Sequence, residues 1–158
     1  MNRSVQGVYT VEFAVVGSIF FLVLFAVLEV SRLMYTWSVL TEVSRRGARL
    51  AAVCNILTDP GLDGQTIGAS TGIAGIASFE QQSLLPNFSA NNVAVSYLTL
   101  NGSQATHFSD VRLVRVTIQN YQHNFLLPGF SITLNSPDFS TTIPRESLGV
   151  SRYDYTSC

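Results

Sequence analysis

A single acidic side chain stands near the start of an otherwise apolar stretch. Glu12 follows Gly7 by five positions, and the run from Phe13 to Leu28 has no charge, no proline and no amide side chain. A carboxylate in the apolar layer of a membrane costs on the order of 2.5 to 3.5 kcal/mol at the bilayer centre and less near the interface. We therefore expect Glu12 to require a cationic partner.

The other residues with reactive side chains do not form a recognisable set. His107 and His123 are the only histidines, and Asp110 follows the first by three positions. No pair of histidines or cysteines has metal-ligand spacing, and no nucleophile-elbow motif occurs. We expect no metal site, no cofactor and no catalytic centre.

The apolar stretch is long enough to span a bilayer. From Val8 to Leu28 it covers 21 residues, roughly 32 Å of helix, which matches the hydrocarbon thickness. Its apolar core exceeds the about 7 to 15 residues of a secretory signal, and no small-residue cleavage site follows promptly. We expect it to stay attached as an anchor. An ordinary signal anchor with an accidental glutamate is the simplest alternative.

The start of the stretch resembles a known processing site. Gly7, four residues, Glu12, Phe13 and then an apolar run is similar to the class III prepilin site, at which a membrane peptidase cuts after the glycine. The resemblance implies that Val8 becomes the mature N-terminus and that Glu12 becomes its fifth residue. Cleavage then frees an α-amino group that can pair with Glu12 of a neighbouring subunit.

The longer stretch from Gly7 to Ala52 resembles the TadE/TadF family of tight-adherence (Flp, type IVc) pilus proteins. The likeness includes Glu29 after the span and the Arg-Arg-Gly-Ala-Arg sequence at 45–49. It implies a non-enzymatic minor pilin or pseudopilin of the bacterial inner membrane, with the C-terminal domain in the periplasm or in an extracellular pilus. The implied partners are the prepilin peptidase, other Tad/Flp pilins and the pilus assembly platform, and the implied role is surface attachment and biofilm formation.

Two other functions remain open. A pseudopilin of a type II secretion-like system has a similar leader, but such proteins usually cleave before Phe or Met, whereas Val8 follows Gly7 here. A signal-anchored periplasmic binding or catalytic domain has no part in a filament and predicts no dependence on a prepilin peptidase.

Composition restricts the partners and the orientation. Charged residues make up 12% of the 158 residues, the nine basic residues are all arginine, and the formal net charge is -1. This balance argues against nucleic-acid binding. Arg3 alone precedes the span, whereas Arg32 and three further arginines follow it, which opposes the positive-inside bias. The family resemblance places the C-terminal part outside the cytoplasm.

The span continues as an amphipathic helix to about Val53, because apolar residues recur at steps of three or four as far as Cys54. Gly17 and Ser18 are small enough to let other helices approach closely. Tyr35 and Trp37 lie about 42 Å from Val8 along the helix axis, where aromatic side chains favour the outer membrane interface.

Two cysteines in an exported domain suggest one disulfide bridge. Cys54 closes the long helix and Cys158 is the last residue of the sequence. A bridge between them closes a loop of roughly 100 residues, nominally worth about 4 to 5 kcal/mol. The alternative is a buried Cys54 acting as a small apolar residue and a frayed Cys158.

The remainder predicts an extracytoplasmic head. Turn-forming residues fill 55–64, and a short helix is expected near 74–85. Apolar and polar residues alternate with period two from Val93 and again from Val111 to Tyr121, which predicts two strands. After a turn at 128–129, we expect two further strands, FSITLN at 130–135 and FSTTI at 139–143. We expect an antiparallel meander covered by the outer half of the helix, a pilin-like α+β fold. The chain then divides into a leader at 1–7, a long helix at 8–54 and a head at 55–158.

Overall fold

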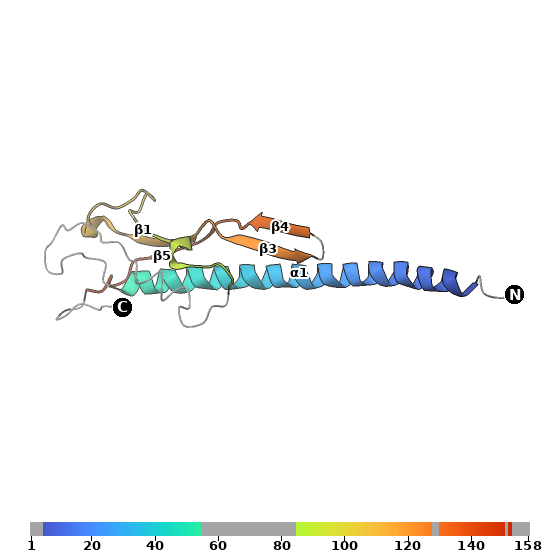
Figure 1. Ribbon diagram of the computed structural model, residues 1–158. Coiled ribbons are helices and arrows are strands. Elements are labelled where there is room, and N and C mark those ends of the chain that lie inside the picture. Colours follow the sequence, from blue (N-terminus) through green and yellow to red (C-terminus); the bar gives the residue numbers. More distant parts are fainter. Residues whose placement is uncertain (1–4, 55–84, 128–129, 151, 153–158) are drawn as a thin grey trace. The chain divides into compact units, whose positions relative to one another are not determined.

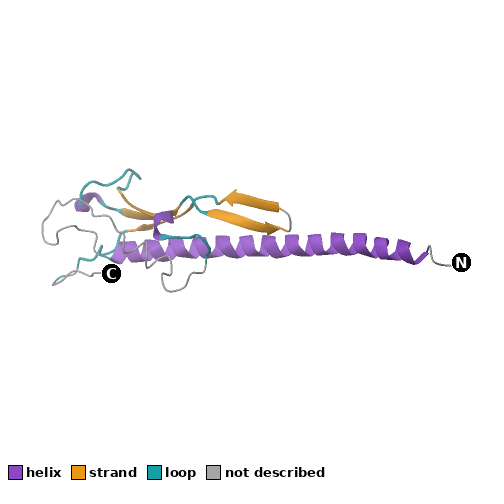
Figure 2. Cartoon of the chain, viewed as in Figure 1, coloured by secondary structure: helices purple, strands orange, loops and turns teal. Residues whose placement is uncertain are grey.

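One long helix dominates the computed structural model, which describes residues 5–54, 85–127, 130–150 and 152 (Figure 1). Helix α1 runs from Val5 to Val53, 49 residues, and ends where the periodicity predicts (Figure 2). It begins three residues before the expected Val8, so Gly7 lies within its first turns. The turn predicted at 55–64 and all but the last residue of the helix predicted at 74–85 lie outside the described residues.

The chain forms two compact units. The first contains the chain up to Tyr35 together with His123–Leu134, and the second contains Thr36–Gln122 and the chain from Asn135 onward. Helix α1 therefore contributes to both units, with its apolar first part in one and its amphipathic last part in the other.

The second unit is built on a three-stranded antiparallel sheet. Its strands are β1 (Val93–Leu98), β2 (Leu113–Ile118) and β5 (Phe139–Pro144), in the order β1-β2-β5. In the register, Val116 of β2 lies between Val95 of β1 and Thr141 of β5. The period-two alternation of β2 has the predicted effect, because Val114, Val116 and Ile118 are buried while Arg115 is exposed.

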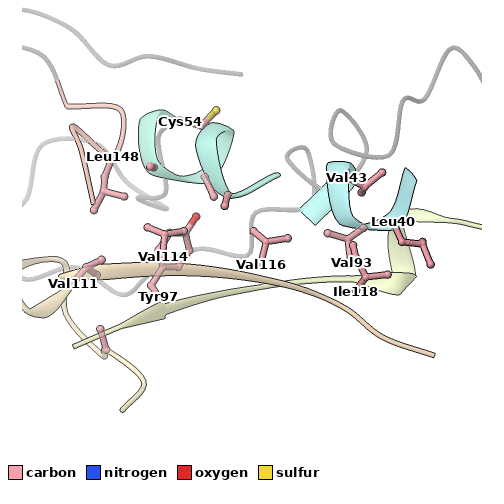
Figure 3. Close-up of a cluster of buried hydrophobic side chains, with 14 of the residues drawn as sticks. Leu40, Val43, Cys54, Val93, Tyr97, Val111, Val114, Val116, Ile118 and Leu148 are labelled. Carbon is pink, nitrogen blue, oxygen red and sulfur yellow. The ribbon is translucent and has the colours of Figure 1, made fainter. Parts of the chain in front are cut away.

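The last part of α1 covers this sheet, as the sequence predicts. Figure 3 shows Leu40 and Val43 of the helix facing the strands, and every one of the largest core side chains is almost fully buried. At the β5 edge the Ser44 hydroxyl lies 2.8 Å from the Thr141 hydroxyl, so a hydrogen bond supplements the apolar contact. The buried apolar cluster comprises Leu40, Val43, Ala48, Ala51, Ala52, Cys54, Leu85, Val93, Tyr97, Ala105, Val111, Val114, Val116, Ile118, Tyr121 and Leu148.

Two short 3-10 helices flank the first strands. One covers Ala90–Asn92 before β1, and the other covers Phe108–Asp110 in the loop before β2. That loop reverses at Gly102, whose φ of 82° is a left-handed conformation that glycine adopts without steric cost. The long connection therefore still allows β1 and β2 to pair antiparallel, as expected.

The predicted meander is wrong. Strand β2 pairs next with β5, and the residues between them form a separate two-stranded sheet of β3 (Gln122–Leu127) and β4 (Phe130–Asn135). The strand predicted to reach Tyr121 stops at Ile118, because Asn120 adopts a φ of 57°, a left-handed conformation that ends an extended run. β3 was not predicted, although β4 and β5 lie at the predicted residues.

The fold class is nevertheless the predicted one. A long N-terminal helix packs on a small antiparallel sheet, with the core between the two. This is an α+β arrangement in which a single helix supplies one whole layer.

Candidate functional site

The first part of α1 presents an almost continuous apolar surface. Every residue from Val8 to Leu28 is exposed except Gly17 and Ala26, which are half-buried. Among the described residues, α1 is the one helix that is long and apolar enough to cross a membrane. An exposed apolar surface of this extent is costly in water, so the helix requires a membrane or other apolar helices around it.

The residues of the predicted processing site lie on this exposed helix. Gly7, Val8, Glu12 and Phe13 are all helical and all exposed. A residue and its fourth successor lie on the same side of a helix, about one turn apart, so Val8 and Glu12 share a face.

The helical conformation bears on the predicted cleavage after Gly7. A peptidase acts on an extended peptide, so the bond after Gly7 has to leave the helix first. Glycine in a helix is about 1 kcal/mol less favourable than alanine, and helix ends fray, so unwinding at this position costs little. A Cβ built at Gly7 has no atom within 4 Å, so close packing within the chain does not require the glycine.

Gly17 and Ser18 leave room on the helix surface. A Cβ built at Gly17 also has no atom within 4 Å. The Ser18 hydroxyl donates to the carbonyl of Ala14 at 2.7 Å, so its polar group is satisfied within the helix. Both small residues can therefore face a neighbouring helix without leaving a polar group unpaired.

The two predicted interface aromatics differ in their surroundings. Tyr35 is exposed. Trp37 is half-buried and packs against Phe139, with ring centroids 6.4 Å apart. Its indole N–H is buried and has no hydrogen-bond partner among the described residues. Trp37 therefore packs within the second unit, in addition to its predicted place at the membrane interface.

Of the two cysteines in the predicted disulfide, the structure describes Cys54. Cys54 is buried in the core cluster, directly after the end of α1. Cys158 lies outside the described residues, so the bridge between the two remains a prediction. Comparison of reducing and non-reducing electrophoresis of the alkylated protein tests it.

A polar cluster in the first unit was not predicted as a site. Arg32 donates from Nη1 to Glu29 Oε1 at 2.8 Å and from Nη2 to the backbone carbonyl of Asn124. The second oxygen of Glu29, Oε2, is buried and accepts no hydrogen bond from the described part of the chain. The arginine therefore connects α1 to β3 and partly neutralises a buried acid.

His123 belongs to the same cluster. It is 2% exposed and packs edge-on against Phe125, with ring centroids 5.1 Å apart. Burial, and then the positive charge of Arg32, lower the pKa of His123 below its ordinary value, while Glu29 opposes the shift. The i, i+3 spacing of Glu29 and Arg32 was visible in the sequence. The approach of β3 was not, because β3 itself was not predicted.

Within residues 5–54, 85–127, 130–150 and 152, no three His, Cys, Asp or Glu side chains lie together as a metal site. His107 and Asp110 are both exposed on the loop before β2.

The comparison with known protein families matches the same stretch of sequence that resembles the TadE/TadF family. Residues 7–49 match the model of a family described as TadE-like protein. No curated protein and no solved structure matches the chain. The matched range lies wholly within α1 and includes the apolar stretch, Glu12 and the Glu29–Arg32 pair.

Proposed function

We propose that this chain, whose residues 7–49 match the model of a TadE-like family, is a non-enzymatic minor pilin of the tight-adherence pilus system. α1 anchors it in the inner membrane with the head in the periplasm, and a prepilin peptidase removes the leader at 1–7. The observation that carries the proposal is an exposed acid on an apolar helix, five residues after a glycine, inside the family-matched range.

Cleavage supplies the partner that Glu12 lacks in an apolar layer. The new ammonium group of Val8 pairs with Glu12 of a neighbouring subunit, and the pairing reduces the cost of keeping either charge among apolar side chains. Gly17 and Ser18 lie on the same exposed stretch and allow the close helix approach that such a pair requires.

The size of the head favours a minor role over a major one. Major pilins of this system resemble a bare helix, whereas this chain continues for about 100 residues after α1. A head of that size crowds a thin filament of closely packed helices. Priming of assembly, a position at the tip, or adhesion through the head fits this shape better than repetition along the filament.

Mass spectrometry of the mature N-terminus, in cells with and without the peptidase, tests the proposal. We expect a chain beginning at Val8 only when the peptidase is present. A type II secretion pseudopilin is also cleaved, but its deletion impairs secretion and not tight-adherence piliation. A signal-anchored periplasmic domain keeps the same N-terminus in both strains. An uncleaved chain in piliated cells contradicts the proposal.

Replacement of the acid separates anchoring from assembly. Glu12→Leu removes the charge and is expected to preserve membrane insertion while reducing piliation severely. Thr10→Leu is the matched control, because it removes a nearby polar group without changing charge and is expected to leave piliation intact. Membrane fractionation and counting of pili by electron microscopy measure the two effects. Normal piliation with Glu12→Leu contradicts the pairing mechanism.

A further inference from the structure

The β3–β4 hairpin exposes apolar side chains on both of its faces near its tip. Leu126 is 70% exposed and Ile132 is 52% exposed. Gln122 bonds Asn135 across the hairpin and Asn124 bonds Thr133, so these facing pairs share one face with Leu126. Ile132 alternates with Thr133 and lies on the opposite face, together with His123 and Phe125. The face that carries Ile132 is buried within the chain at His123 and is exposed only farther along the hairpin, at Ile132.

The sequence of the hairpin changes from polar residues around Gln122 and Asn135 to a mostly apolar run at 125–130. The hydrogen-bonded amides and hydroxyls occupy the end near Gln122 and Asn135, and the sequence at 125–130 reads Phe-Leu-Leu-Pro-Gly-Phe. No Asp, Glu, Lys or Arg occurs from 124 to 137. This gradient along the hairpin is the one expected of a segment that enters an apolar layer with its tip first.

The polar cluster fixes the hairpin at the outer end of the apolar stretch. Arg32 lies four residues after the apolar run ends at Leu28, and it binds the backbone carbonyl of Asn124. Figure 1 shows β3 running beside α1 toward the N-terminus of the helix, within the first unit. Three strand residues advance about 10 Å, and about 10 Å of helix is six to seven residues. The end of β3 therefore lies at about the level of Phe25, one turn inside the apolar run.

We propose that the β3–β4 hairpin is a second membrane-contacting element, whose exposed Leu126 and Ile132 side chains enter the boundary between headgroups and acyl chains beside α1. The inference rests on the proposed role of α1 as the membrane anchor. It adds that this hairpin of the head, and not the helix alone, contacts the lipid. An isolated two-stranded sheet has unpaired backbone groups along its edges, which exclude it from the hydrocarbon centre, so the contact is confined to the interface.

Depth-dependent fluorescence quenching tests the proposal on the full chain. Trp37 is the only tryptophan, so Trp37→Phe provides a silent background. Ile132→Trp and Leu126→Trp are then introduced singly, and the proteins are reconstituted at less than one chain per vesicle. The phosphatidylcholine vesicles carry bromine at either a shallow or a deep position of the acyl chain. We expect a blue-shifted emission for both variants and a larger loss of emission with shallow bromine than with deep bromine.

Two further positions make the outcomes distinguishable. Phe20→Trp lies in the apolar stretch and reports whether α1 is inserted, with the larger loss expected from deep bromine. Leu100→Trp replaces a residue that is 77% exposed in the second unit and is expected to show no loss. If Phe20→Trp is quenched but the two hairpin variants are not, the hairpin proposal is wrong while the anchor stands. If Phe20→Trp is not quenched, the anchor itself is wrong, and the hairpin proposal with it.

A protein partner predicts a different pattern. If the hairpin instead covers a second copy of α1, the emission of Ile132→Trp shifts to the blue only when many chains share a vesicle, and bromine does not quench it. That result overturns the lipid assignment. Quenching that is already complete at the lowest chain density supports it.

Discussion

Removal of the Arg32 guanidinium should release the β3–β4 hairpin from α1. The substitution Arg32→Met keeps most of the apolar stem and removes the hydrogen bonds to Glu29 and to the Asn124 carbonyl. Hydrogen bonds to charged groups contribute about 1.5 to 3 kcal/mol each. The bond to Glu29 lies within α1, so the hairpin directly loses the bond to Asn124, and the buried Glu29 carboxylate is left without its cation when the hairpin is docked. Because 34% of the arginine side chain is exposed, we take about 2 kcal/mol for these two effects together.

The assay is hydrogen exchange of the hairpin amides, measured by mass spectrometry in detergent micelles. A loss of about 2 kcal/mol corresponds to about a 30-fold rise in the population of the undocked hairpin, and its amides are expected to exchange faster by that factor. Arg115→Met is the matched control, because Arg115 is exposed and its Nε donates to Thr142 in the second unit. It should leave exchange in the hairpin unchanged.

A double substitution tests whether the unpaired Glu29 carboxylate causes part of the destabilisation. Arg32→Met leaves the buried Glu29 carboxylate without its cation, whereas the addition of Glu29→Leu removes that carboxylate as well. Replacement of a buried ion pair by apolar groups is often neutral, so the double variant should recover part of the lost protection. If Arg32→Met leaves exchange of the hairpin within about twofold of the original, the pair does not hold the hairpin and the reasoning from its contacts is wrong.

Three further predictions follow from burial and open space. Burial and the nearby guanidinium lower the pKa of His123 in the folded chain, so hairpin protection should be complete above its ordinary value of 6.5 and fall as the pH decreases below it. His123→Gln should abolish this pH dependence in hydrogen exchange, whereas His107→Gln should not. Leu40→Ala removes a fully buried side chain from the core of the second unit and should cost about 2 to 5 kcal/mol of unfolding free energy, measured by denaturant titration. Gly17→Leu enters open space in the single chain, so stability should not change, but energy transfer between labelled chains in vesicles should fall, while Val16→Leu should preserve it.

The sequence was most informative where one physical constraint acts along the whole segment. Helix α1 follows from a continuous apolar run up to Leu28 and from apolar residues at steps of three and four after it, and its last part covers the sheet as expected. Strand β2 was identified from its alternation, because Val114, Val116 and Ile118 all face the core. These patterns are local, so they can be read without knowledge of the rest of the fold.

The pairing of strands depends on information that the pattern does not contain. Consecutive strands usually pair, so a meander was the natural expectation, but β5 occupies the edge of β2 and leaves β3 and β4 to each other. The signal for β3 was present, because Pro128-Gly129 separates two apolar runs of similar length. The period of β3 is obscured by the polar His123 and Asn124, of which the first is buried in the cluster with Glu29.

In the candidate site, too, some residues could be identified from the sequence and one contact could not. Gly7, Glu12 and Gly17 were singled out by residue type and spacing, and the structure places them on an open helix surface. The contact of Arg32 with Asn124 joins residues 92 positions apart, so it could not be predicted without the fold.

The pairing of β2 with β5 makes the hairpin a separable insert. Gln122 and Asn135 face each other with their side chains 3.1 Å apart, and the next pair is closed by the Ser136 N–H bonding the Tyr121 carbonyl at 2.8 Å. The chain thus leaves the second unit and returns to it at neighbouring points, a gap that a two-residue Asn-Gly turn can bridge. Residues 123–134 contribute no strand pairing to the sheet of β1, β2 and β5. The ladder of the helix-and-sheet core is therefore complete without the hairpin, and the hairpin can serve a purpose other than holding that core together.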